Sequence, residues 1–203
     1  MIRKFLLSLA LAFAGANIAL ADTAAIVLDP ASGVLNNNGT WSLGFEFTLN
    51  NSVTVTSLGF FADGGVFSVP HEVGIFSVAG NLLVSTTVSN SDPLEAGFRY
   101  RAIAPLALGP GNYVISGTTG PDQYLYDPAV FSTAPEVTYV TDRYVASSSL
   151  DFPVEGTSVN RGYFGPNFKF STASVGVPEP SSALALGIGV LLCARLRRAG
   201  RNG

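Results

Sequence analysis

Hydrophobic and polar residues alternate along much of the chain between residues 22 and 170. The run TWSLGFEFTLN is the clearest case, and its apolar side chains all fall on one face: Trp41, Leu43, Phe45, Phe47 and Leu49. Small or polar residues take the other face. A period of two residues is that of a β-strand that rests on a core. The pattern predicts a strand over 41–49, with Trp41 in the core because it shares the face of the phenylalanines.

Other short runs rich in β-branched and aromatic residues continue this pattern: AAIVL, SVTVTSLGFF, HEVGIFSV, LLVSTTV, FRYRAIAPL, NYVISGT, EVTYVTDRYV and GPNFKF. Turn formers such as Asp63-Gly64-Gly65 and Gly109-Pro110-Gly111 separate them. Eight or nine short strands with frequent turns predict an all-β fold, an antiparallel β-sandwich of jelly-roll or immunoglobulin-like type over residues 22–170. The stretch 122–135 interrupts the pattern and is expected to form a loop, the usual location of function.

The N-terminal residues 1–21 have the layout of a secretory signal peptide. MIRK carries two positive charges, an apolar stretch follows, and Ala19-Leu20-Ala21 fits a small-x-small cleavage site. The sequence therefore predicts export through the inner membrane, with cleavage after Ala21. An uncleaved membrane anchor is the alternative.

An apolar run near the C-terminus precedes an arginine cluster. Residues 183–194 would reach about 18 Å as a helix, against roughly 30 Å of hydrocarbon. Arg195, Arg197 and Arg198 follow the run, and such positive flanks stay on the cytoplasmic side. The pattern predicts a short transmembrane helix; a soluble amphipathic helix is disfavoured because the run has no polar face.

The last 27 residues, 177–203, resemble the PEP-CTERM sorting signal of Gram-negative bacteria. Val177-Pro178-Glu179-Pro180-Ser181 comes first, then the apolar run, then the arginines. The resemblance implies that Pro178, Glu179 and Pro180 are read by exosortase, a membrane-embedded cysteine protease, in organisms that commonly make exopolysaccharide. Residues 171–176 would be the linker. The protein would then be anchored in the membrane until processing and afterwards lie at the cell surface or outside the cell.

The body is similar to a recurrent domain of unassigned function in exported PEP-CTERM proteins. The matching pieces are 44–47, 55–59, 71–76, 97–100 and 163–168, among them His-Glu-Val-Gly-Ile-Phe and Tyr-Phe-Gly-Pro-Asn-Phe. This resemblance implies no activity.

The net charge and the scarcity of cysteine and histidine argue against several classes of function. Between Asp22 and Val175 there are five basic and 13 acidic residues, a net charge of −8, which argues against nucleic acid as a partner. The single cysteine, Cys193, lies in the C-terminal run, and His71 is the single histidine. Zinc and thiol chemistry are therefore disfavoured in the body.

Two groups of residues are candidate binding sites. Asp63, Asp122 and Asp127 offer oxygen ligands for calcium, although neither segment matches an EF-hand and plain turns are the simpler interpretation. Five aromatic residues are candidates for a platform that stacks on sugars: Trp41, Tyr124, Tyr126, Tyr144 and Tyr163. Tyr124 and Tyr126 are favoured, since they share one side of an extended segment. Pinning of a loop is the alternative role.

Enzymatic function has little support in the sequence. His71 has no nucleophile elbow beside it and is expected to begin a strand and bond a loop carbonyl. A glycan hydrolase with paired carboxylates is the alternative function, and its candidates are Glu46, Glu72, Asp122, Asp127, Asp142 and Glu155. No spacing singles out two of them. We therefore expect a non-enzymatic protein without a cofactor, in a structural or carbohydrate-contacting role that includes exopolysaccharide as a partner.

Overall fold

The computed structural model describes residues 22–127, 130–156 and 162–172, which form β-strands and two short 3-10 helices. The strands are β1 (Thr23–Ala24), β2 (Ile26–Asp29), β3 (Val34–Asn36), β4 (Trp41–Leu49), β5 (Val53–Phe61), β6 (His71–Ser77), β7 (Leu82–Val88), β8 (Leu94–Glu95), β9 (Phe98–Leu108), β10 (Gly111–Thr118), β11 (Tyr124–Tyr126), β12 (Val130–Thr133), β13 (Val137–Ala146), β14 (Tyr163–Phe164) and β15 (Pro166–Ser171). The helices are η1 (Pro30–Ser32) and η2 (Asp63–Gly65). The predicted all-β fold is confirmed, and β4 lies within the run TWSLGFEFTLN that was predicted to be a strand.

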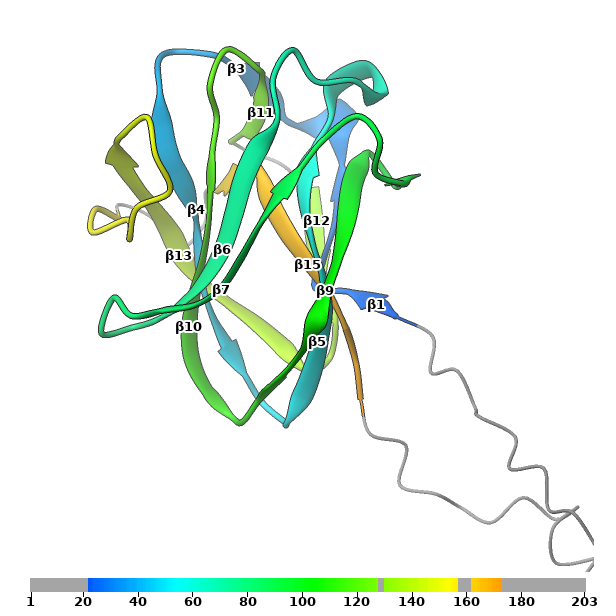
Figure 1. The fold of residues 1–203 in the computed structure, drawn as a ribbon, viewed down its shortest axis with the longest axis vertical. Helices are drawn as coiled ribbons and strands as arrows, with labels where there is room; N and C mark the ends of the chain where they lie inside the picture. The colour runs from blue at the N-terminus through cyan, green and yellow to red at the C-terminus, as the bar shows by residue number, and fades with distance from the viewer. Residues whose placement is uncertain (1–21, 128–129, 157–161, 173–203) are drawn as a thin grey trace, which may run out of the picture.

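Two antiparallel five-stranded sheets make up most of the molecule (Figure 1). Their strand orders are β1-β15-β5-β9-β8 and β13-β4-β10-β6-β7. A three-stranded sheet, β14-β11-β3, and a two-stranded sheet, β12-β2, complete the described part. The stretch 122–135, expected to be a loop, therefore contains two short strands, β11 and β12, because each finds a distant partner strand that its own sequence does not reveal.

Four strand pairs are nested along the chain. β6 pairs with β7, β5 with β9, β4 with β10, and β1 with β15. These pairs form one long antiparallel hairpin whose tip lies between β6 and β7. The hairpin is folded over so that successive pairs belong alternately to the two five-stranded sheets. β13 adds to the free edge of β4.

Phenylalanine rings fill the space between the two large sheets. Phe47 of β4 and Phe168 of β15 are both fully buried, and their ring centroids lie 4.8 Å apart. Burial of such rings is the main stabilising contribution in a domain without a disulfide. The apolar face predicted for β4 is confirmed from Leu43 to Leu49, whereas Trp41, expected in the core, is only half-buried at the end of the strand.

The opposite face of β4 is covered as well. The Ser42 hydroxyl lies 2.8 Å from the Ser116 hydroxyl and donates to the Asp151 carbonyl at 2.8 Å. A Cβ on Gly44 would lie 2.1 Å from the Ile115 carbonyl oxygen, so the close approach of β10 requires glycine there. The chain around residue 151 therefore lies over the outer face of this sheet.

The two ends of the molecule differ in what they carry. Thr54, near the start of β5, lies opposite Ser171, and Thr23 lies opposite Phe170, so the described chain begins and ends side by side (Figure 1). Phe61, at the other end of β5, is seven residues from Thr54, about 23 Å away along a strand. The end near Phe61, which we call the distal end, carries the loops 37–40, 62–70 and 119–123.

Candidate functional site

Five aromatic side chains form a continuous cluster near the distal end. Tyr163 is at its centre: its ring centroid lies 5.2 Å from those of Tyr126 and Tyr144 and 5.9 Å from that of Tyr124. Trp41 extends the cluster, with its ring edge-on to Tyr144 at 5.9 Å. These are the five residues named from the sequence as a candidate sugar platform. The structure brings them together from four strands, β4, β11, β13 and β14. We call them the aromatic cluster.

The members of the aromatic cluster are not equally accessible. Trp41, Tyr126, Tyr144 and Tyr163 are half-buried, whereas Tyr124 is only 1% exposed. Tyr126 and Tyr163 are stacked, with an angle of 19° between their rings. Of the two predicted carbohydrate contacts, Tyr126 is therefore accessible, while Tyr124 is a buried support. The second accessible ring beside Tyr126 is therefore Tyr163, and not Tyr124 as the sequence predicted.

Pairing between strands distant in the sequence and one amide hold the aromatic cluster in place. β11 is extended as predicted, and its Tyr126 lies opposite Tyr163 of β14. The side-chain oxygen of Asn38 accepts hydrogen bonds from Trp41 Nε1 at 3.0 Å and from the Tyr124 hydroxyl at 2.9 Å. From the sequence Asn38 was expected only to be a turn residue, in the Asn38-Gly39-Thr40 triplet.

The hydroxyls of Tyr124 and Tyr163 are neutral at physiological pH. Burial, followed by the neighbouring Tyr126, raises the pKa of Tyr124 to about 12. Burial also raises the pKa of Tyr163 to about 12, with smaller contributions from Tyr126 and Asp142. A neutral tyrosine offers a hydroxyl that both donates and accepts hydrogen bonds.

A cavity of about 360 Å³ opens between the loops of the distal end. Its lining combines carboxylates, amides, a hydroxyl and apolar groups: Asn37, Phe61, Asp63, Val66, Phe67, Ser68, Pro121, Asp122 and Gln123. Asp63 begins η2, in which Gly64 and Gly65 have φ of 61° and 82°, values that favour glycine. We call this space the distal cavity.

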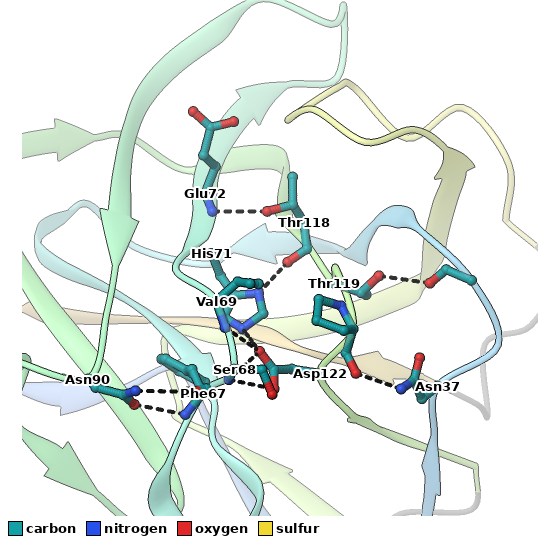
Figure 2. Close-up of polar contacts among 12 residues, drawn as sticks. Asn37, Phe67, Ser68, Val69, His71, Glu72, Asn90, Thr118, Thr119 and Asp122 are labelled. Carbon is teal, nitrogen blue, oxygen red and sulfur yellow. Dashed lines mark hydrogen bonds and ion pairs between the residues drawn. The ribbon is translucent and has the colours of Figure 1, made fainter.

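Asp122 links two of the loops around the distal cavity (Figure 2). Its carboxylate accepts the backbone N–H of Ser68 at 2.8 Å and that of Val69 at 3.1 Å, and contacts His71 Nε2 at 3.1 Å. Burial raises the pKa of Asp122, but these amide donors and the nearby His71 outweigh it and hold the pKa below its ordinary value. Asp122 is thus a carboxylate that is fixed by the fold.

His71 lies beneath this loop connection. The side chain is fully buried, stacks on Phe60 with centroids 4.1 Å apart, and has Nδ1 2.7 Å from the Thr118 carbonyl oxygen. Burial lowers the pKa of His71, opposed by the Thr118 carbonyl and by Asp122. The prediction that His71 begins a strand and bonds a carbonyl is confirmed, although that carbonyl ends β10 and is not in a loop.

The family comparison covers most of the chain. The model of a domain of unknown function, DUF4082, matches residues 28–177. The chain belongs to this family. No curated protein and no solved structure matches the chain. The DUF4082 match includes the aromatic cluster and the distal cavity, so any function of the domain has to be argued from the geometry of such sites.

The three candidate calcium ligands of this DUF4082 domain lie in different places. Asp63 and Asp122 share the distal cavity although they are 59 residues apart in the sequence, whereas Asp127 follows β11 and does not line the cavity. Within residues 22–127, 130–156 and 162–172, no group of three or more His, Cys, Asp or Glu side chains is placed to hold a metal ion.

The other carboxylates of the DUF4082 domain that were considered for hydrolysis have contacts within the sheets. Glu46 pairs with Arg143, Glu72 accepts the Leu150 N–H at 3.4 Å, and the buried Asp142 accepts the Thr141 hydroxyl at 3.2 Å. Glu155 forms a backbone bridge with Tyr144. None of these four acids lines the distal cavity.

Several predicted residues lie outside the described part of the chain. They are the signal peptide 1–21, the sorting motif Pro178, Glu179 and Pro180, and the flanking Arg195, Arg197 and Arg198. Among the residues that the structure describes, no helix has the length and apolarity needed to cross a membrane.

Proposed function

We propose that this chain is an exported, non-enzymatic β-sandwich protein whose distal end contacts carbohydrate at the cell surface or in the extracellular matrix. The aromatic cluster is the observation that carries the proposal. We further propose that the sandwich is of the jelly-roll type, which the nested pairing of β1 with β15, β4 with β10, β5 with β9 and β6 with β7 supports.

The chemistry of the aromatic cluster suits a sugar. The ring faces of Tyr126 and Tyr163 are flat and apolar, as is the C–H face of a pyranose, and packing the two together removes apolar surface from water. Tyrosine and tryptophan do this at low entropic cost, because few torsions are immobilised. The hydroxyls of Tyr126 and Tyr163 can bond sugar hydroxyls, whereas the indole N–H of Trp41 is already bonded to Asn38. Half-burial keeps the rings in place before the ligand arrives, which favours binding.

We propose the PEP-CTERM route for delivery, with exosortase as the partner of Pro178, Glu179 and Pro180 and the inner membrane as a transient partner of the tail. The pairing of β1 with β15 supports the geometry, since both chain ends leave the domain together and away from the distal end. A chain held by its tail would therefore present the distal end away from the membrane.

The carbohydrate proposal is tested with exopolysaccharide and the exported full chain in a pull-down and by calorimetry. Tyr126→Ala should weaken binding by at least about tenfold, the effect of losing 1.4 kcal/mol. Tyr113→Ala is the matched control, because Tyr113 lies on β10 beside Phe47, outside the aromatic cluster. Absence of binding by the unaltered protein, or equal losses in both variants, would refute the proposal.

The delivery proposal is tested by the intact mass of the protein recovered separately from membranes and from medium of an exosortase-bearing host. Loss of residues 1–21 and of the segment after Pro180 is the expected result. An extracellular form that retains its arginine tail would refute the sorting proposal. The tail would then be interpreted as a permanent single-span anchor.

A further inference from the structure

The basic side chains of the described residues are all engaged by acids or carbonyls. Arg99 donates to the carbonyls of Gly65 and Asp92, and Arg101 pairs with the Asp92 carboxylate at 3.2 Å. The remaining two pairs are Arg143 with Glu46 and Lys169 with Glu95. Within the described part of the chain, therefore, no cation remains free to bind a carboxylate, sulfate or phosphate on a ligand.

Carboxylates, in contrast, face the distal cavity. Asp63 is exposed and accepts no side-chain hydrogen bond from the described residues, and Asp122 keeps a lowered pKa. Asn37 and Gln123 add amide groups, and the rings of Phe61 and Phe67 add apolar walls. Carboxylate and amide oxygens accept hydrogen bonds from hydroxyl groups, and the carboxylates repel anions in a partly enclosed space.

The distal cavity and the aromatic cluster share a wall. Asn37 lines the cavity and donates to the Pro121 carbonyl, while its neighbour Asn38 holds Trp41 and Tyr124. Gln123 also lines the cavity, and the next residue, Tyr124, belongs to the cluster. Figure 2 shows the hydrogen bond by which Asn37 reaches the segment that carries Asp122. Adjacent residues on two segments therefore join the two regions, which places the cavity within reach of a ligand of several sugar units that lies on the cluster.

We infer that the ligand is an uncharged glycan chain of several sugar units, stacked on Tyr126 and Tyr163 and hydrogen-bonded through its hydroxyls to the carboxylate and amide groups of the distal cavity. This inference rests on the proposed carbohydrate function. It adds a substrate class, neutral glycans as opposed to uronate or sulfated polymers, and a second contact region.

Ligand charge is tested with the exported full chain and three polymers in calorimetry at low and at physiological salt: a neutral β-glucan, polygalacturonate and chitosan. The neutral glycan should bind with little dependence on salt, because no ion pair is involved. Polygalacturonate should bind at least about tenfold more weakly at low salt. Equal or tighter binding of polygalacturonate would overturn the inference, and so would binding of chitosan alone, which would indicate recognition of an amine.

The second contact region is tested with neutral oligosaccharides of two to eight units. Asp63→Asn should weaken binding of the longer members by about three- to tenfold, as expected for one hydrogen bond to a charged group, and leave the shortest unchanged. Glu136→Gln, near Asn50 at the opposite end, is the matched control. Tyr126→Ala should weaken binding at every length.

The outcomes separate the two proposals. If Asp63→Asn has no effect at any length while Tyr126→Ala does, the inference fails and the carbohydrate function of the aromatic cluster stands. If neither variant changes the binding of any glycan, both fail.

Discussion

The molecule has two aromatic regions of opposite character. Between the sheets most rings are phenylalanines with no polar atom, and Phe47, Phe60, Phe168 and Phe170 are completely buried; Tyr100 is the tyrosine that joins them in the buried core. Near the distal end the rings are tyrosine and tryptophan, and four of the five keep part of their surface in solvent. Burying a hydroxyl needs a partner, whereas burying a phenyl ring does not.

The difference separates stability from binding. The core rings gain from full removal from water and from close packing between sheets. The aromatic cluster leaves its ring surface only half-covered and adds hydroxyls. Its rings therefore stabilise the fold less than core rings do, unless a ligand covers them. This comparison predicts that substitutions in the core lower stability with little effect on glycan affinity, and that those at the half-buried rings of the cluster lower glycan affinity strongly with a smaller loss of stability.

The largest effect is expected for Phe168→Ala in the core. The ring is fully buried and packs on Phe47 and Phe170, so its removal should lower the free energy of unfolding by about 3–5 kcal/mol. Thermal melting should fall by roughly 10 °C or more. Glycan affinity of the folded variant, measured below its melting range, should stay unchanged. A large loss of affinity there would contradict the separation of the two regions.

Tyr163→Ala tests the same separation from the side of the cluster. Because this ring is half-buried, its removal should cost about 2 kcal/mol of stability, less than a core ring. Glycan affinity should drop below detection, since Tyr126 and Tyr144 lose their shared neighbour. Tyr163→Phe is the control that keeps the ring. A loss of stability as large as that of Phe168→Ala would make the cluster part of the core.

Much of the core could be predicted from the sequence. Alternation over 41–49 gave the correct strand and core face, because each side of a strand faces one environment. The order in which the strands pair could not be predicted from the sequence. Alternation does not identify a partner strand many residues away, as for β1 and β15.

The candidate site was predictable in its residue types but not in its details. All five aromatic residues were named, yet the burial of Tyr124 depends on Asn38 and on pairing with β14 and β3. Asp63 and Asp122 were named as candidate calcium ligands, but their shared cavity arises from loops that only the fold brings together.

His71 connects the two regions, because it stacks on Phe60 of the core and contacts Asp122 of the distal cavity. Its pKa is lowered by burial from the ordinary value of 6.5, so the unfolded chain binds more protons once the pH falls below 6.5. The stability from neutral His71 is complete above pH 6.5 and is lost on acidification, by at most about 1.4 kcal/mol per pH unit. Melting temperatures between pH 7.5 and 5.5 measure this loss.

His71→Gln is the control for that titration. His71 is the single histidine of the chain, and the ordinary carboxyl pKa values lie below this range. The variant should therefore be less stable but nearly flat between pH 7.5 and 5.5. Stability of the unaltered protein that rises on acidification would mean that the Thr118 carbonyl and Asp122 outweigh burial.

The smallest effect is expected for Tyr126→Phe, which removes a hydroxyl and leaves the stacked ring. The side chain is half-buried, so loss of its hydroxyl should change stability by no more than about 0.5 kcal/mol. If the ring face makes the main contact with sugar, affinity should fall by only about threefold, against at least about tenfold for Tyr126→Ala. Calorimetry with the same neutral glycan compares the two variants. Equal losses in both would mean that the hydroxyl, and not the stacked ring, recognises the ligand, and the contrast between a phenylalanine core and a tyrosine surface would then be one of hydrogen bonding alone.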